Sequence, residues 1–190
     1  MWAISPVLQN RVPMALEYQR ETAMPNDYFV AADNGAGYLM PGMLQEPREI
    51  SGFKSGLDAW VRHCKPYYNR WDLTITGFVI DGTAPGLSKE GLDCYASFSP
   101  DGILPQKVPW TVLHGEMPVL RSDYEIIADD PKEAAQHLLE RVKVRPIPFH
   151  WFRKIRKTPS WYKEVVSEIK KLDPNIELLD APTFFALYKE

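Results

Sequence analysis

The chain alternates between short apolar segments and segments of helical periodicity, and this alternation restricts its fold more than any other feature. Apolar, β-type runs at residues 2–5, 26–33 and 73–80 are each followed by residues that recur at helical spacing. Helices are expected at about 12–23, 54–69, 89–98, 131–144, 158–172 and 182–188. Strands that alternate with helices in this way indicate βαβ units and a mainly parallel sheet.

The remaining strands are shorter and less regular. They are expected at residues 102–104, 117–121, 147–152 and 176–179, although Pro148 favours an edge position for its segment. A complete eight-fold βα barrel usually needs about 250 residues, and this chain has 190. We therefore expect one α/β domain over residues 1–190, built as an irregular or incomplete TIM-barrel-like fold. A doubly wound open parallel sheet is the alternative.

Composition and charge argue against several classes of protein. The net charge is −3 and the one basic cluster, at 153–157, is expected to be a solvated strand exit, so nucleic acid is not an expected partner. No run of about 18 apolar residues exists, and no membrane span is expected. Two cysteines are too few for a disulfide scaffold, and the four histidines lack ligand-like spacing. Neither a metal nor a cofactor is therefore expected, and the first ten residues lack the pattern of a signal peptide.

Polar residues stand at the ends of the expected strands. Ligands of parallel α/β folds gather at the carboxyl ends of strands, where the loops vary while the sheet holds them in place. These ends carry Ser5, Asp33 and Asn34, Asp81, Arg121, His150 with Trp151, and Asp180. An aspartate after a strand often only caps the next turn. A capping role is favoured for Asp180. For Asp81, a capping role and a functional role are equally expected.

The loop from Asp33 to Tyr38 carries the largest number of such residues. Gly35 and Gly37 allow positive φ and a close approach of the backbone, and Tyr38 offers a ring face and a hydroxyl. The loop has no third glycine opening a helix, which argues against a phosphate cradle. A carbohydrate held by carboxylate, amide and phenol groups fits this loop better.

The residues Gly35-Ala36-Gly37-Tyr38-Leu39-Met40-Pro41 resemble the signature of the GxGYxYP family of glycoside hydrolases, with Met40 in place of the second tyrosine. Residues 2–6, 25–30 and 183–187 also resemble the family, so the similarity spans nearly the whole chain. It implies equivalence to the family's C-terminal domain, an α/β barrel-like fold, a carbohydrate ligand and frequent export from the cell. It also implies an N-terminal domain that is absent from this chain.

Hydrolysis of a glycosidic bond needs two carboxyl groups about 5 to 9.5 Å apart. The eligible carboxylates are Asp33, Asp81, Glu116 and Asp180, and their spacing in the sequence does not select a pair. We expect Asp33 and Asp81 to be catalytic, as acid/base or nucleophile, and Glu116 is a further catalytic candidate. Contacts to the sugar are expected from Asn34, Gly35, Gly37, Tyr38, His150 and Trp151. The alternatives are a non-catalytic carbohydrate-binding or accessory domain and a structural fragment of a larger enzyme.

Overall fold

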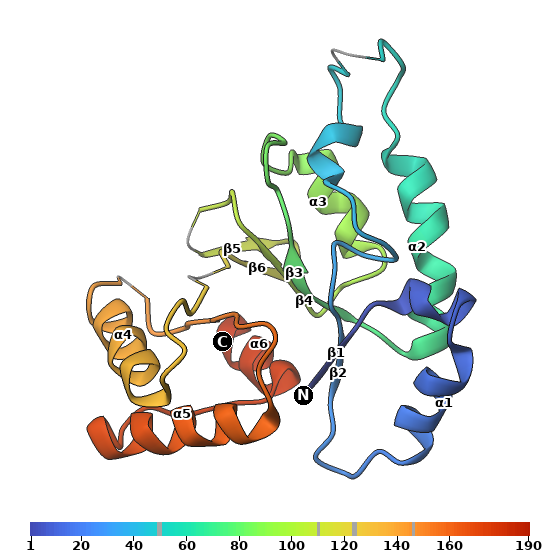
Figure 1. Ribbon diagram of the computed structural model, residues 1–190. Coiled ribbons are helices and arrows are strands. Elements are labelled where there is room, and N and C mark those ends of the chain that lie inside the picture. Colours follow the sequence, from blue (N-terminus) through green and yellow to red (C-terminus); the bar gives the residue numbers. More distant parts are fainter. Residues whose placement is uncertain (49–50, 110, 123–124, 146) are drawn as a thin grey trace. The chain divides into compact units, whose positions relative to one another are not determined.

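The structure is a computed structural model that describes residues 1–190 apart from 49–50, 110, 123–124 and 146. It divides into two compact units (Figure 1). Unit 1 comprises Met1–Arg121 and Asp180–Glu190, and unit 2 comprises Ser122–Leu179. The expectation of a single domain stays a prediction. Among the described residues, no helix has the length and apolar character needed to cross a membrane.

Unit 1 is built on a six-stranded sheet with the order β1-β2-β3-β4-β6-β5. The strands are β1 (Trp2–Ile4), β2 (Phe29–Ala31), β3 (Ile75–Val79), β4 (Gly102–Pro105), β5 (Thr111–His114) and β6 (Met117–Leu120). Every pairing is parallel except that of β5 with β6, which form an antiparallel hairpin. The order advances steadily from β1 to β4, as in part of a barrel, and the described strands form an open sheet. The expected α/β fold, mainly parallel and barrel-like but incomplete, is confirmed.

Helices cover both faces of this sheet. Those of unit 1 are α1 (Pro13–Glu21), α2 (Leu57–Trp71), α3 (Lys89–Ala96) and α6 (Ala181–Lys189), with 3-10 helices η1 (Pro6–Asn10) and η2 (Pro41–Leu44). Ile103 of β4 packs in one core cluster with residues of α1, α2 and α3. Its neighbour Gly102 faces the opposite way, because successive strand residues alternate, and there it meets the Phe185 ring of α6. Figure 1 accordingly shows α2 and α3 on one side of the strands and α6 on the other.

The core between the sheet and α2 also contains hydroxyl groups. Tyr68 of α2 is hydrogen bonded to Thr76 of β3, with 2.7 Å between the oxygens, and Thr76 donates to Ser99 over 2.9 Å. All three side chains are buried. A buried hydroxyl without a partner would cost about 1–3 kcal/mol. The chain of hydroxyls therefore satisfies these groups together and fixes α2 against β3 and the turn before β4.

Unit 2 contains two helices packed against each other, α4 (Pro131–Lys143) and α5 (Pro159–Leu172). Its buried cluster consists of Ile126, Ala128, Ala134, Ala135, Leu138, Leu139, Trp161, Val165 and Ile169. Both helices begin at a capping side chain followed by proline: Asp130 accepts from two backbone N–H groups, and Thr158 accepts from that of Trp161. Such caps stabilise a helix by about 1 kcal/mol each.

The strands expected at 147–152 and 176–179 are not formed among the described residues. An isolated parallel bridge between Glu125 and Arg153 forms just after the first segment. Pro148 has no backbone N–H to donate, and an apolar run becomes a strand only where a partner strand lies beside it. The antiparallel strand β5 has no counterpart among the expected elements.

Candidate functional site

The loop after β2 is held to the loop after β3 by the buried side chain of Asn34. Its Oδ1 accepts from the backbone N–H of Ile80 and its Nδ2 donates to the carbonyl of Leu39. The Asn34 carbonyl in turn accepts from the hydroxyl of Tyr95 on α3. Through its side-chain amide and its backbone carbonyl, Asn34 thus connects three segments at the carboxyl edge of the sheet. Asn34, expected to contact a sugar, is fully buried and positions this edge.

The backbone at Gly35 and Ala36 lies directly on α2. A Cβ added to Gly35, whose φ is +152°, would lie 2.5 Å from the Trp60 ring and 2.8 Å from the Cys64 sulfur. The Ala36 N–H donates to that sulfur over 3.4 Å, and His63 Nε2 donates to the Ala36 carbonyl over 2.8 Å. Burial raises the pKa of the Cys64 thiol to about 12, so this group is an inert packing element. Glycine is therefore required at position 35 by close packing.

Asp33 and Tyr38 are the groups of this loop that reach the surface. Asp33 is half-buried and makes no hydrogen bond or ion pair with the described part of the chain. Tyr38 is 71% exposed, and a Cβ added to Gly37 beside it would meet nothing within 4 Å. The exposed end of the loop therefore offers a free carboxylate and an aromatic ring to solvent.

Asp81 follows β3 and is fully buried. Its Oδ2 accepts from the backbone N–H groups of Gln106 and Lys107, over 2.8 and 2.6 Å. Its Oδ1 is buried and has no hydrogen-bond partner among the described residues. Burial is the main cause that raises the pKa of Asp81, and the two backbone donors oppose it. The carboxyl group therefore keeps its proton to a higher pH than an exposed aspartate does.

Two glutamine side chains also form hydrogen bonds between the loops after β2, β3 and β4. Gln106 Oε1 accepts from the backbone N–H of Asp81 over 3.0 Å, so residues 81 and 106 bind each other reciprocally. Buried Gln45, just after η2, donates to the carbonyl of Gly86 over 3.1 Å and accepts from the N–H of Ser88 over 2.6 Å. The loops after β2, β3 and β4 are thus fixed to one another by side-chain amides.

Met40 occupies the position of the second tyrosine in the signature. Its sulfur would lie 2.6 Å from a Cβ on Gly82 and accepts from the Thr83 hydroxyl over 3.8 Å. Gly82 has a φ of +52° and leaves the room that this thioether fills. Met40 therefore makes an apolar contact between the loop after β2 and the loop after β3.

Glu116 lies at the other edge of the sheet. It directly precedes β6, which runs parallel to β4, whereas Asp33 and Asp81 follow β2 and β3. A strand of four or five residues separates the two edges by about 13–17 Å. The structure therefore brings Asp33 and Asp81 to one edge and does not bring Glu116 to them.

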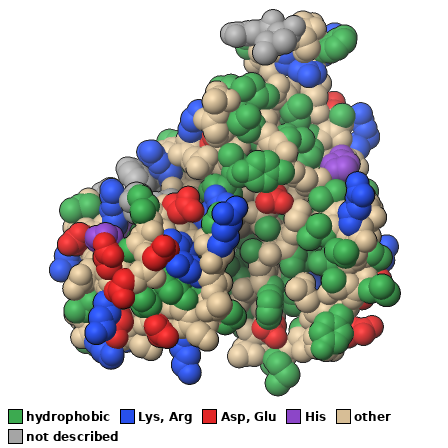
Figure 2. Space-filling view, viewed as in Figure 1, with side chains coloured by type: hydrophobic (Ala, Val, Ile, Leu, Met, Phe, Trp, Pro, Cys, Tyr) green, Lys and Arg blue, Asp and Glu red, His purple; other side chains and the backbone are tan. Residues whose placement is uncertain are grey.

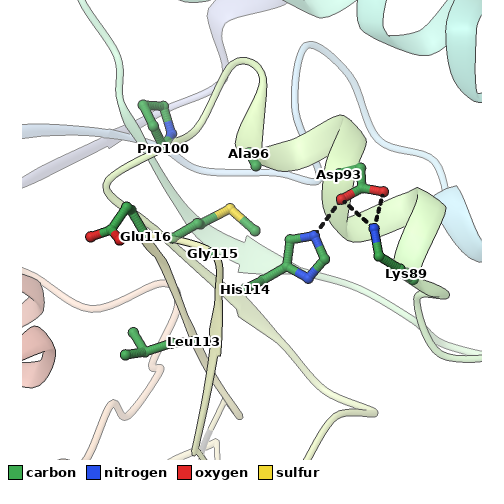
Figure 3. A pocket seen from close by; sticks show the side chains of 9 residues that line it. Lys89, Asp93, Ala96, Pro100, Leu113, His114, Gly115 and Glu116 are labelled. Carbon is green, nitrogen blue, oxygen red and sulfur yellow. Dashed lines mark hydrogen bonds and ion pairs between the residues drawn. The ribbon is translucent and has the colours of Figure 1, made fainter.

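An open pocket lies around the β5–β6 hairpin, with Glu116 at its rim (Figure 3). His114 Nε2 is 2.6 Å from one oxygen of Asp93, and Lys89 Nζ is 2.8 Å from the other. The Glu116 side chain points away from this group in Figure 3. First Lys89 and then His114 lower the pKa of Asp93. The hydrogen bond between His114 and Asp93 joins the hairpin to α3.

The remaining expected residues lie elsewhere. His150 and Trp151 belong to unit 2 and are half-buried, and the ring of His150 stacks on that of Phe152. Burial, then the nearby Arg145, lowers the pKa of His150. Asp180 caps α6, accepting from the Thr183 N–H over 2.8 Å, as favoured from the sequence. No group of three or more metal-ligating side chains occurs within the described ranges.

Sequence reasoning missed Gln45 and Gln106. Gln106 directly follows β4, so the rule that selected Asp33 and Asp81 at strand ends would also select it once amides are included. No local pattern marks Gln45, because its partners Gly86 and Ser88 lie more than 40 residues away in the sequence.

A mainly parallel, barrel-like sheet with its polar loops joined at the carboxyl edge defines the class of unit 1 as an α/β protein. In proteins of this class, ligands bind at that edge. Residues 1–189 match the model of the GxGYxYP putative glycoside hydrolase C-terminal domain, and the chain belongs to this family.

The fold is also that of a solved structure. A crystal structure of a putative hydrolase from Bacteroides thetaiotaomicron VPI-5482 superposes with a TM-score of 0.72 at 17% identity. The match covers 98% of this chain and 38% of the other, so the chain spans well under half of that relative's length. At this identity the likeness shows the fold alone. No curated protein matches the chain significantly.

Proposed function

We propose that the carboxyl edge of unit 1 forms the carbohydrate-facing part of a glycoside hydrolase site, with Asp33 as the carboxylate that contacts the sugar. The observation that carries the proposal is the pairing of a free, half-buried Asp33 with the exposed Tyr38 on a loop fixed by Asn34. Rigid support of a polar group is what binding and catalysis require of a site.

Asp81 is the second carboxyl group of this proposal. Its raised pKa suits it to the role of general acid, which must hold a proton near the working pH. Asp33, at the end of the adjacent strand and open to solvent, then acts as nucleophile or base. Glycosidases use two carboxyl groups in such unlike environments. Tyr38 supplies a ring face for the C–H face of a sugar.

A carbohydrate-binding role without catalysis is the second candidate. It is favoured by one observation: Asp81 is fully buried, and one of its oxygens already accepts from two backbone N–H groups. In that case Asp81 only holds the loop after β4 in place, and Asp33 and Tyr38 bind sugar. Either activity would belong to the longer protein, with this chain as its C-terminal part and an N-terminal domain as its partner.

A screen for released reducing ends tests the catalytic proposal. The longer protein and this chain would be incubated with 4-nitrophenyl glycosides and soluble glucans, xylans, mannans and pectins. We expect turnover of at least one substrate, and a loss of at least about 100-fold in Asp33→Asn and Asp81→Asn. Asp58→Asn, at an exposed position in the first turn of α2, is the control and should retain full activity. Unchanged turnover in both variants would exclude the proposed pair.

Binding separates the two candidates. Calorimetry with the same polysaccharides should show binding by the unmodified chain and a loss of about 10-fold or more in Tyr38→Ala. Tyr18→Ala is the matched control, since Tyr18 is similarly exposed, at 66%, but lies on α1. Binding that depends on Tyr38, without turnover by the longer protein, would favour the binding module. Binding unaffected by Tyr38→Ala would show that the loop has only a structural role.

A further inference from the structure

The side-chain amide of Gln106 is held by its oxygen alone. Oε1 accepts from the backbone N–H of Asp81 over 3.0 Å and from that of Gly82 over 3.4 Å. Both partners are donors, and an amide nitrogen cannot accept from them. The contacts therefore fix which way the amide is turned, with Nε2 directed away from the turn that begins at Asp81.

The Nε2 group is left unused by the protein. Within the described part of the chain it donates to no partner, and Gln106 is only partly buried. Gln45 shows the contrast at the same edge: it is buried, and its Nε2 donates to the carbonyls of Gly42 and Gly86, over 3.4 and 3.1 Å. One amide is thus wholly occupied in joining loops, while the other presents two N–H donors in a fixed direction.

We infer that Gln106 is a ligand-binding residue of the carboxyl edge, whose Nε2 donates hydrogen bonds to oxygen atoms of a sugar. The inference rests on the proposed function and extends it to the loop after β4. Hydroxyl oxygens of a sugar are acceptors that a neutral amide can bind without the desolvation cost of a charge. Because Oε1 is already bound, the side chain loses little conformational freedom when the ligand arrives.

The place of Gln106 in the network explains why this donor suits such a site. Gln106 and Asp81 bind each other through backbone and side-chain atoms, so the donor is held in a fixed relation to the buried carboxyl. Lys107, the next residue, donates through Nζ to the carbonyl of Ala84 over 2.5 Å, at the far end of the same turn. The turn at 81–84 is therefore fixed at both ends, and the Nε2 of Gln106 is held at its start.

NMR titration of the unmodified chain, labelled with 13C and 15N, tests the inference. The probes are glucose, galactose, mannose, xylose and glucuronate, followed through the side-chain amide signals of Gln106 and Gln45 and the ring signals of Tyr38. We expect at least one sugar to shift the signals of Gln106 together with those of Tyr38, and to leave Gln45 unmoved. Shifts at Tyr38 without a shift at Gln106 would overturn the inference and leave the proposed function standing. Absence of shifts at this edge, with no turnover in the polysaccharide screen, would overturn both.

Gln106→Glu gives a second, independent measurement. A glutamate keeps an oxygen that accepts from the Asp81 N–H but lacks both Nε2 donors. Affinity for the sugar that shifts Tyr38 should fall about 10-fold or more, since a bound oxygen loses its donor. Gln136→Glu, at an exposed position of α4, adds the same charge in unit 2 and should bind like the unmodified chain. Equal binding by both variants would contradict a role for Gln106 in recognition, whereas the titration decides the question if Gln106→Glu does not fold.

Discussion

The two units are stabilised in different ways. At the carboxyl edge of unit 1, uncharged amides and one buried carboxyl group join segments that lie about 25 to 60 residues apart. In unit 2, the corresponding contacts are charged and near the surface: Asp129 is 80% exposed, and its Oδ1 lies 2.7 Å from Lys157 Nζ and 3.1 Å from Lys154 Nζ.

Composition follows the same division. Unit 2 contains eleven Lys and Arg and ten Asp and Glu residues, although it is less than half the size of unit 1. In Figure 2, red and blue side chains are dense over the α4–α5 region, and green ones predominate over the region of α1 and α2. Exposed ion pairs contribute little and are screened by salt, whereas removing one partner of a buried polar contact costs about 1–3 kcal/mol. The edge of unit 1 should therefore tolerate substitution less well than the surface of unit 2.

The largest effect is expected at Gly35. Gly35→Ala places a Cβ within 2.8 Å of both Trp60 and Cys64, at a φ that strains an alanine, and should destabilise unit 1 by about 3–5 kcal/mol. Gly37→Ala is the matched control, because φ is +131° there but nothing lies within 4 Å, and backbone strain alone should cost about 1–3 kcal/mol. Urea unfolding followed by NMR signals of each unit measures both. Equal losses would show that close packing at Gly35 is unimportant.

The next effect concerns the side-chain amide of Asn34, which joins the loop after β2 to the loop after β3. Asn34→Ala leaves the Ile80 N–H and the Leu39 carbonyl without partners and should cost about 2–4 kcal/mol in unit 1. Asn26→Ala, at an exposed position in the loop before β2, should change the free energy of unfolding by less than about 0.5 kcal/mol. The same urea titration applies. A loss of under about 1 kcal/mol at Asn34 would mean that the edge of unit 1 is no more dependent on buried contacts than unit 2.

A smaller effect is expected in unit 2. Asp130→Ala removes the acceptor for the backbone N–H groups of Lys132 and Glu133, both 3.0 Å away, and should cost about 1 kcal/mol. Glu140→Ala, on the exposed face of α4, is the control and should be close to neutral, since alanine favours helices. Thermal unfolding followed by circular dichroism and by the NMR signals of α4 measures the difference. A cost at Asp130 equal to that at Asn34 would remove the contrast between the units.

The smallest expected effect is on the pH dependence of stability, which has opposite signs in the two units. Burial raises the pKa of Asp81, so the folded chain holds this proton more tightly than the unfolded chain does. Its contribution to stability is greatest at low pH and falls as the pH rises from about 3.9 towards the folded pKa. Lys157 and then Lys154 lower the pKa of Asp129, so its contribution is present above about pH 3.9 and is lost as the pH falls through the folded pKa.

Urea titrations between about pH 3 and pH 6, read from the NMR signals of each unit, measure these two trends. Asp81→Asn should abolish the decline of unit 1 with rising pH, and Asp129→Asn should abolish the loss of unit 2 on acidification. Added salt should weaken the second effect more than the first, because the Asp129 carboxylate is exposed and Asp81 is buried. The same pH trend in both units would contradict the assignment of Asp81 as a buried carboxyl that retains its proton.

The helices could be predicted because their signals are local. The periodicity over 54–69 and 131–144 gives α2 and α4 within a few residues, and the cap favoured at Asp180 is the side chain that the structure uses. Strands depend on a neighbour, which a segment such as 147–152 does not reveal. The strand-end rule found Asp33 and Asp81 at one edge and could not place Glu116, because the β5–β6 hairpin reverses the chain and sets that residue at the other edge.

By itself, the sequence determined the α/β class, the parallel sheet, the signature loop and the family, since these depend on periodicity, strand ends and a short motif. Only the tertiary structure decided which polar groups of that loop are free. Asn34 and Asp81 are buried against partners far along the chain, while Asp33 and Tyr38 stay at the surface. Gln106 binds Asp81 and Gly82 through its oxygen, and among the described residues its Nε2 has no acceptor. The reason is physical: a polar group is buried only where distant backbone groups satisfy it, and no local pattern records where those groups lie.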